Sequence, residues 1–353
     1  MSRARRDYSL TGPEYECAAE RGLVDADWYA SPIPRERLRE LMRRRNGPAI
    51  RDTIIWIALL VGLGTLAVLL RDSRWCVLVF LLYGIVYMSP ADSRWHECGH
   101  GTAFRTSWMN TAVYHFASFL AIRPGTPWRW SHIEHHSDTI IVGRDPEIVQ
   151  RRPPIFYAVM LETLRIWGIG HELPSILRHA SGRISDAEKT FLPQSHWRKT
   201  IWEARLYLLL WAGIIGLCLV VGNVMPLLLV GLPALYGGPL FWCTTIAQHL
   251  GLHEDVLDHR LNSRTVYMNP VVRFLYWNMN YHVEHHMFPM VPYHALPALH
   301  EEMKSDTPEP CPSLPAAMKE VLSALAQERK DPTFVVSKPL PPTAQPYRFV
   351  AAS

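Results

Sequence analysis

Histidine side chains of this chain gather in short clusters whose spacing suits metal binding. His96 and His100 lie four residues apart in HECGH, and two further clusters read HIEHH at 132–136 and HVEHH at 282–286. Because residues three and four apart share one face of a helix, each cluster can direct two or three imidazoles at one point. Imidazole binds iron, zinc, copper and nickel. The clusters therefore predict a site for more than one metal ion.

Other histidine patterns leave alternatives open. His249 and His253 lie four residues apart in QHLGLH, directly after a long apolar run. HECGH also matches HExxH, in which Glu97 would be the general base of a zinc protease. That alternative needs only one more ligand and leaves the other clusters unexplained. Histidines outside the clusters, among them His179, His259 and His300, are expected at the surface, except His115, which is expected to pack or to face substrate.

Long uncharged runs predict the elements that position the clusters. Residues 206–248 are 43 consecutive positions without a charged side chain, whereas one bilayer span takes about 20 apolar residues. With 48% apolar and 19% charged residues, the composition excludes a disordered chain. We predict an all-α integral membrane protein with four transmembrane helices in two hairpins, capped by a cytosolic helical domain that holds a His-rich di-metal site. The spans are expected at about 53–70, 75–91, 204–222 and 224–246.

The order of the clusters, HxxxH, HxxHH and HxxHH, with apolar hairpins around them, resembles the membrane fatty acid desaturase and hydroxylase superfamily over about residues 50–305. The resemblance implies two iron ions at the cytosolic membrane face, which use O2 to attack an unactivated C–H bond. It gives His253 no counterpart, but this residue lies one helical turn after His249 and is a candidate to bind a metal or to support a ligand. The ligands that the resemblance implies are His96, His100, His132, His135, His136, His249, His282, His285 and His286.

Polar residues beside the clusters are candidates to support the ligands. A carboxylate that accepts the second N–H of a ligating imidazole fixes its tautomer and orientation. For each candidate, a surface salt bridge is the alternative. Two asparagines, Asn278 and Asn280, could bond a water at the metals or the backbone. The carboxylate candidates are Glu97, Glu134, Asp138, Asp145, Asp255 and Glu284.

Two sequence stretches indicate a particular subset of the superfamily and a class of substrate. TIIVGRDPE at 139–147 and NMNYHVEHHMFPMVP at 278–292 resemble a bacterial subset, the rhizopine-catabolism and rhizobitoxine-type desaturase-like proteins. That subset implies oxidation of a small or amphiphilic metabolite by desaturation, hydroxylation or oxidative demethylation. A fatty acyl desaturase acting on lipid or acyl-CoA is the alternative. The segment between the first two clusters adds polar groups that suit a small substrate: Arg105, Thr106, Asn110, Thr111, Arg123, Thr126 and Arg129.

Composition along the chain predicts its location and its partners. The first 51 residues hold 11 Arg and 8 acidic residues. Such a basic flank marks the cytoplasmic side of a membrane helix, so we expect both termini and the active site in the cytosol of a bacterium, at its inner membrane, with no nucleic-acid partner. The expected parts are a cytosolic N-terminal lead at 1–50, a membrane desaturase-like domain at 51–305 and a Pro-rich cytosolic tail at 306–353.

Electrons and metal complete the expected machinery. No HPGG motif of a cytochrome b5 module occurs, so a separate ferredoxin, with a Rieske type as one option, and its reductase are expected to supply electrons. Two Fe ions are the expected cofactor, O2 is the co-substrate, and zinc can replace iron in an overexpressed sample. A His-rich membrane metal transporter is the alternative from another class. Such a transporter would carry ionisable residues within its spans, and the four expected spans carry no charge apart from Arg205 at the edge of the third.

Overall fold

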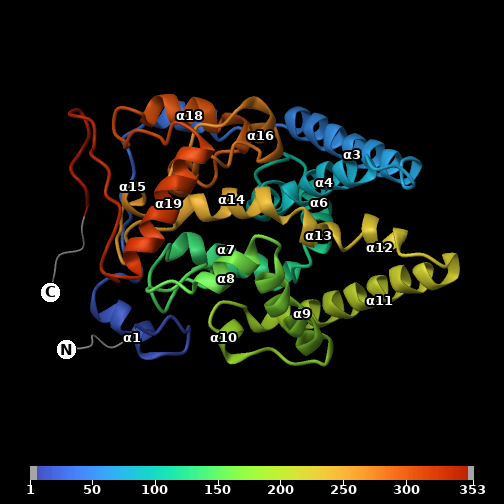
Figure 1. The fold of residues 1–353 in the computed structure, drawn as a ribbon. Coiled ribbons are helices and arrows are strands. Elements are labelled where there is room, and N and C mark those ends of the chain that lie inside the picture. Colours follow the sequence, from blue (N-terminus) through green and yellow to red (C-terminus); the bar gives the residue numbers. More distant parts are fainter. Residues whose placement is uncertain (1–5, 349–353) are drawn as a thin grey trace.

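The computed structural model describes residues 6–348, which fold into helices joined by loops (Figure 1). Within this range no β-strand forms, although two isolated β-bridges pair Thr265 with Tyr281 and Val266 with Cys311. The all-helical prediction is confirmed. Four helical stretches are long and apolar enough to cross a membrane: Arg35–Leu69, Cys76–His100, Gln194–Val221 and Met225–His249.

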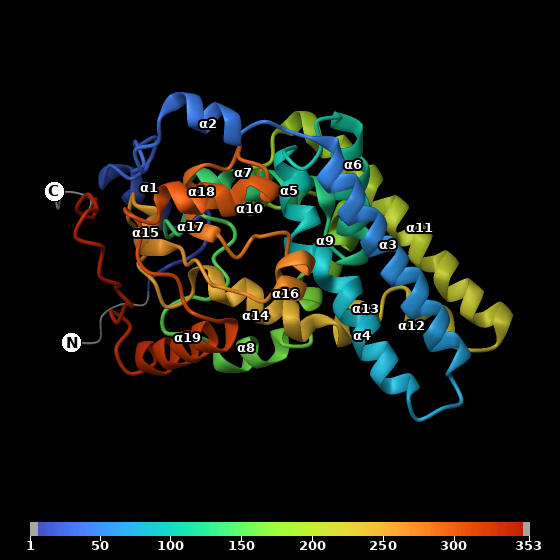
Figure 2. The ribbon, with the colours of Figure 1, turned by 90° about the horizontal axis from the view of Figure 1, so that it is seen from above.

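The first and third of these stretches contain the longest helices, α3 (Asn46–Leu69) and α11 (Trp197–Val221). Both expose large aliphatic side chains: Leu69 is 75% exposed and Val220 is 84% exposed. Apolar surface of this extent marks contact with a membrane or a partner. In Figures 1 and 2 the outer ends of α3 and α11 lie at one end of the molecule.

The second stretch contains α4 (Cys76–Met88), which packs against α3. The fourth stretch is broken, as prolines at N-terminal helix positions predict. A close approach of two glycines joins α4 to it: a Cβ atom on Gly237 would lie 2.0 Å from the carbonyl oxygen of Gly84. The fourth stretch consists of α12 (Met225–Leu229), α13 (Pro233–Tyr236) and α14 (Gly238–His249).

The other helices, with α2, η1, α5 and η2 from the inner parts of the stretches themselves, gather around the inner ends of the four stretches (Figure 2). An aromatic core that includes Trp95, Tyr114, Trp277 and Tyr293 joins several of them. They are α1 (Pro13–Glu20), α2 (Arg35–Leu41), α5 (Arg94–His100), α6 (Ser107–Leu120), α7 (Gly125–Ser137), α8 (Phe156–Glu162), α9 (Ile166–Ala180), α10 (Asp186–Lys189), α15 (His259–Asn262), α16 (Pro270–Leu275), α17 (His282–Met287), α18 (Leu296–Met303) and α19 (Leu314–Glu328), with the 3₁₀ turns η1 (Ser89–Asp92), η2 (Gln194–His196) and η3 (Tyr293–Ala295).

Candidate metal centre

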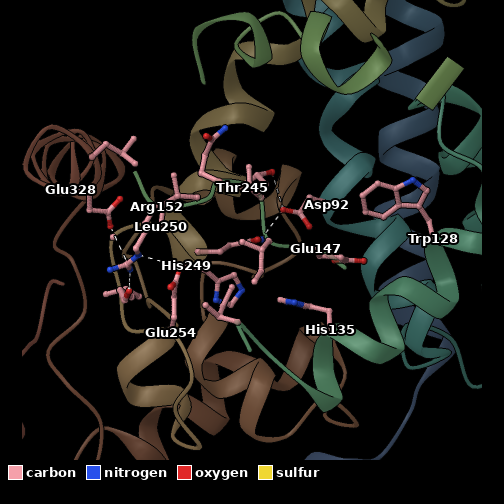
Figure 3. Close-up of a pocket in the computed structure, with 18 of the residues that line it drawn as sticks. Asp92, Trp128, His135, Glu147, Arg152, Thr245, His249, Leu250, Glu254 and Glu328 are labelled. Atoms are coloured by element: carbon pink, nitrogen blue, oxygen red, sulfur yellow. Dashed lines mark hydrogen bonds and ion pairs between the residues drawn. The ribbon is translucent and has the colours of Figure 1, made fainter. Parts of the chain in front are cut away.

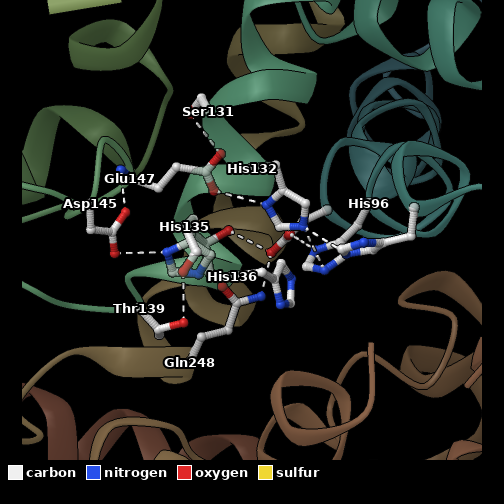
Figure 4. A network of polar contacts seen from close by, with 12 residues as sticks. His96, Ser131, His132, His135, His136, Thr139, Asp145, Glu147 and Gln248 are labelled. Atoms are coloured by element: carbon white, nitrogen blue, oxygen red, sulfur yellow. Dashed lines mark hydrogen bonds and ion pairs between the residues drawn. The ribbon is translucent and has the colours of Figure 1, made fainter. Parts of the chain in front are cut away.

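Five imidazoles from three helices converge in what we call the first histidine group. One ligand nitrogen from each lies within 4.8 Å of every other. Helix α5 follows η1 and supplies two rings, α7 supplies two, and α17 supplies one. Figure 4 shows three of these rings pointing toward one another. The first histidine group consists of His96, His100, His132, His136 and His285.

The closest approaches in the first group are between Nε2 atoms. His96 Nε2 lies 2.7 Å from His285 Nε2 and 3.0 Å from His132 Nε2, and His132 Nε2 lies 3.1 Å from His100 Nε2. Nitrogen lone pairs that converge in this way repel one another unless a proton or a cation lies between them. The donor set therefore fits a metal ion.

Four further imidazoles form the second histidine group, next to the first. His135, His249 and His286 bring ligand nitrogens within 4.8 Å of one another. His282 joins them, because its Nε2 lies 2.9 Å from His249 Nε2 and 3.0 Å from His286 Nε2. In HIEHH, His132 and His136 belong to the first group and His135 to the second. In HVEHH, His285 belongs to the first group and His282 and His286 to the second, so each cluster supplies rings to both groups. Together the two groups bring together all nine histidines that the resemblance implied.

His253 lies in neither group. Its Nε2 contacts the hydroxyl of Ser337 at 2.6 Å, although it lies only four residues beyond His249. Helix α14 ends at His249, so the i, i+4 relation that would have placed both rings on one helical face does not apply. The structure gives no support to His253 as a ligand.

Carboxylates contact the Nδ1 atoms of two rings in the first group, whereas the Nδ1 atoms of His136 and His285 have no hydrogen-bond partner. Asp92 Oδ1 lies 3.2 Å from His96 Nδ1, and Glu147 Oε2 lies 3.1 Å from His132 Nδ1. The carboxylate of Glu97 is more distant, at 3.7 Å from His285 Nδ1. Such contacts orient a ligating ring and raise its basicity.

The second group is held mostly by uncharged oxygens. Asp145 Oδ2 lies 2.8 Å from His135 Nδ1. By contrast, His249 Nδ1 lies 2.7 Å from the backbone carbonyl oxygen of Asn262, and His286 Nδ1 lies 3.2 Å from the hydroxyl of Thr139. One carboxylate therefore supports this group.

Sequence reasoning missed two of these supporting carboxylates. Asp92 precedes His96 by four residues, and that spacing was an available signal. Glu147 ends the TIIVGRDPE stretch, and its loop returns to contact α7 (Figure 4). Of the predicted supporting carboxylates, Asp145 and Glu97 approach ligand rings.

The other predicted supporting residues bond elsewhere. Arg144 takes up two of the carboxylates, and Asp255 pairs with Arg21 at 2.8 Å. Asn278 and Asn280 bond backbone carbonyl oxygens. The residues whose recorded contacts lie outside the two groups are Glu134, Asp138, Asp255, Asn278, Asn280 and Glu284.

Three histidines expected at the surface are buried: His179, His259 and His300. His300 Nδ1 lies 2.5 Å from Glu284 Oε1, so it anchors the carboxylate within the HVEHH cluster. The ring of His259 lies 5.1 Å from that of His286 and stacks on Trp28 at 4.3 Å. The surface prediction was wrong for His259 and His300 because both pack against parts of the chain far from their own sequence neighbours. It was wrong for His179 because the Glu188 carboxylate lies 2.7 Å from its Nε2 and satisfies the buried ring.

Burial sets the protonation of the rings and of their supports. It lowers the pKa of His282, His285 and His286 well below the usual range, so these rings stay neutral with free lone pairs. Burial alone would raise the pKa of Glu147, but the His132 ring holds it at about 2. For His135, burial acts to lower the pKa, yet the Asp145 carboxylate raises it to about 9. The Glu147 carboxylate is thus anionic and the three α17 rings are neutral donors, whereas the His135 ring must release a proton before it can bind a metal.

A cavity opens beside the second group (Figure 3). His135 and His249 line it directly, and Asp92 and Glu147 connect it to the first group. Figure 3 shows Trp128 at one end and Glu328 at the other. Apolar side chains complete the wall, among them Trp95, Ile140, Ile148, Val149, Leu250, Leu252 and Leu325, and further polar ones include Arg123, Gln150, Arg152, Thr245, Gln248 and Glu254.

Comparison with known families gives one match that covers most of the chain. A family model described as "Fatty acid desaturase" matches residues 72–315. The matched range includes both histidine groups and all the residues that hold their outer nitrogens.

Curated relatives agree with this match. The chain is 23% identical to the omega-3 fatty acid desaturase, chloroplastic, of Sesamum indicum, over 72% of this chain and 59% of that protein. It is 24% identical to the sn-2 acyl-lipid omega-3 desaturase (ferredoxin), chloroplastic, of Helianthus annuus, over 68% and 58%. An acyl-lipid omega-3 desaturase (cytochrome b5) of the endoplasmic reticulum of Arabidopsis thaliana is 23% identical, over 57% and 56%. The chain thus spans less than two thirds of the length of the curated relatives it matches.

Proposed function

This chain belongs to the fatty acid desaturase family, and from that premise we propose that it is a membrane-bound, O2-dependent, non-haem di-iron oxidoreductase. The observation that carries the proposal is the convergence of nine imidazoles into two adjacent groups beside one cavity. A protease of the HExxH type would need one metal and few ligands. It would leave the second group without a purpose.

Each histidine group would hold one iron. Iron, when bound, would supply the reduction of O2 and the oxidising power that cleavage of an unactivated C–H bond requires. The chain's own part is to hold the rings: Asp92, Glu147 and Asp145 accept N–H bonds from the imidazoles and fix their tautomers. His135 and His249 face the cavity, so a C–H bond held there would lie next to the second group.

We propose a small or amphiphilic metabolite as the substrate, oxidised by desaturation, hydroxylation or oxidative demethylation. The support is the charge in the cavity wall, where Glu254, Glu328 and Arg152 gather at one end. A tunnel for a hydrocarbon chain has no use for buried charges, because each is costly to desolvate. The resemblance to the rhizopine-catabolism and rhizobitoxine-type bacterial subset points the same way.

A fatty acyl chain is the second candidate substrate. The printed names of the relatives describe fatty acid and acyl-lipid desaturases. The apolar part of the cavity wall, which includes Ile148, Leu250 and Leu325, would suit an alkyl chain.

We propose that the four apolar stretches form two membrane hairpins within a domain at 51–305, with the lead at 1–50 and the tail at 306–353 on the cytosolic side of a bacterial inner membrane. The support is that α1, α15 and α19 lie at the end of the molecule opposite the outer ends of α3 and α11 (Figures 1 and 2). Electrons would come from a separate ferredoxin, of Rieske type as one option, with its reductase. One relative is named with ferredoxin and another with cytochrome b5.

A paired substitution tests the proposal. The full chain, loaded with iron in a detergent micelle, is supplied with reduced ferredoxin, and O2 consumption is followed with small metabolites and with acyl lipids. His249→Ala should abolish coupled O2 consumption, because it removes a ring of the second group. His253→Ala, four residues away, should keep the wild-type rate. Wild-type O2 consumption by His249→Ala would contradict the proposal.

A further inference from the structure

Arg123 is a buried cation in the wall of the cavity. It follows α6, is 6% exposed, and lines the cavity together with His135 and His249. The residue before it, Ile122, has a φ of 55°, a left-handed conformation that a β-branched residue rarely adopts. Backbone strain of this kind gathers at ligand sites, and here it lies at the turn that brings Arg123 to the cavity.

The guanidinium group of Arg123 is incompletely satisfied. Its one recorded side-chain hydrogen bond is from Nη1 to the carbonyl oxygen of Ala91, at 2.7 Å. Its Nε is buried and has no hydrogen-bond partner. Among residues 6–348, no carboxylate oxygen lies within 4 Å of its nitrogens. The carboxylate of Asp92, which also lines the cavity, is engaged by His96 and Gln248.

Aromatic rings hold the guanidinium in place. Its central carbon lies 4.5 Å from the ring centre of Trp128, 4.8 Å from that of Trp95 and 5.3 Å from that of Phe241. These rings remove water from the charge and fix the plane of the group. A fixed, dry guanidinium with a free N–H edge matches a carboxylate, which accepts two parallel hydrogen bonds.

Other buried arginines of the chain show how a purely structural one differs. Arg165 shares the Phe241 ring with Arg123, at 5.0 Å, but pairs with Glu162 at 3.2 Å. Arg94 has no carboxylate partner, yet it donates to two backbone carbonyl oxygens and does not line the cavity. The Nε atoms of Arg94 and Arg165 are also buried without a hydrogen-bond partner. Arg123 differs from both because it lines the cavity, pairs with no carboxylate and donates to one carbonyl oxygen.

We propose that Arg123 binds a carboxylate of the substrate, so that the substrate is an organic acid in its free form. The proposal rests on the proposed function and names its substrate class. The Trp95 ring that packs against Arg123 lies 5.4 Å from the ring of His132. One aromatic ring therefore separates the carboxylate site from the first histidine group.

Binding measurements on matched acids and amides test this site. The metal-loaded full chain in detergent micelles is titrated calorimetrically with butanoate, octanoate and palmitate, and with the amide of each. An acid should bind about ten- to a hundredfold more tightly than its amide, which is the range for hydrogen bonds to a charged partner. If butanoate or octanoate binds more tightly than its amide, the substrate is a small organic acid. If only palmitate binds more tightly than its amide, the substrate is a free fatty acid. Both results support a carboxylate site.

Variants locate the preference within the protein. Arg123→Gln should remove the acid preference, whereas Arg165→Gln, a matched buried arginine outside the cavity wall, should keep it. Arg123→Lys retains the positive charge but not the paired N–H donors of the guanidinium, so it should weaken acid binding about tenfold. This variant replaces Arg123→Gln in the test if the latter does not fold. A wild-type protein without acid preference, or a preference that survives in Arg123→Gln, would overturn the inference. Metal content is measured on every sample, because wild-type protein that fails to hold two metals would instead contradict the proposed function.

Discussion

The two histidine groups differ in what holds their outer nitrogens and in what they face. In the first group, Asp92 and Glu147 accept from ligand rings, with Glu97 nearby. The second group has one carboxylate, Asp145, and otherwise a backbone carbonyl and the hydroxyl of Thr139. The second group also supplies both rings that line the cavity.

This difference points to a division of labour. A carboxylate that accepts from a ligating imidazole makes the ring a stronger donor and orients it. The first group should therefore hold its metal more tightly and favour the more oxidised ion. The second group, open to the cavity, should be where substrate approaches and where exchange with solvent is faster.

Removal of a ligand is expected to have the largest effect. His132→Ala in the first group and His249→Ala in the second each open a coordination position, and both should abolish turnover. Metal analysis of the purified variants should find about one ion per chain in place of two, with a different ion lost in each. If either variant retained two ions and wild-type turnover, that ring would not be a ligand.

Changes to the supporting residues are expected to separate the two groups. Asp92→Asn or Glu147→Gln should weaken one metal about 10- to 100-fold, the usual range for loss of such a partner. Thr139→Val removes an uncharged partner of the second group and should cost less. The measurement is competitive metal binding against a chromophoric chelator. An effect of Thr139→Val equal to that of Glu147→Gln would refute the contrast between the groups.

Chelation should distinguish the groups by access. On treatment of the loaded protein with a small chelator, we expect biphasic metal loss, with the faster phase from the second group, because its rings line the cavity. A bulky group at the cavity wall, as in Val149→Trp, should slow the fast phase alone. If both ions were lost in a single phase, and Val149→Trp slowed the loss of both equally, the two groups would be equally accessible.

The smallest expected effect is on stability. His300→Ala leaves the buried Glu284 carboxylate without one of its two partners, which costs about 1–3 kcal/mol. Since Glu284 lies in α17, which supplies rings to both groups, both metals should loosen slightly and equally. The readout is the midpoint of thermal unfolding, with the exposed His171→Ala as control. An unchanged midpoint in His300→Ala would show that this contact contributes nothing.

The cluster spacing and the family resemblance together predicted the nine histidines that converge, because the i, i+3 and i+4 spacing of HIEHH and HVEHH is fixed by one helical turn. Uncharged runs likewise predicted the four apolar stretches. The carboxylates that support the rings were harder to predict, because long-range packing decides which carboxylate contacts which ring. Glu97 approaches His285 from far along the chain, and Glu147 reaches α7 from a loop.

The substrate cavity shows the same limit of sequence reasoning. Of the seven polar residues noted between the first two clusters, only Arg123 lines the cavity. Asn110, for example, instead bonds the backbone of Phe104. Half of the charged side chains in the cavity wall are Arg152, Glu254 and Glu328, which are brought together from distant segments.

The most direct test of the two-group account is the number of metal ions per chain and the nature of their ligands. Full-length protein purified after iron loading is analysed for metal content and by X-ray absorption at the iron edge. The account predicts two ions per chain, with imidazole nitrogen as the protein ligand of both. A single ion per chain, held by two histidines and a carboxylate such as Glu97, would contradict it.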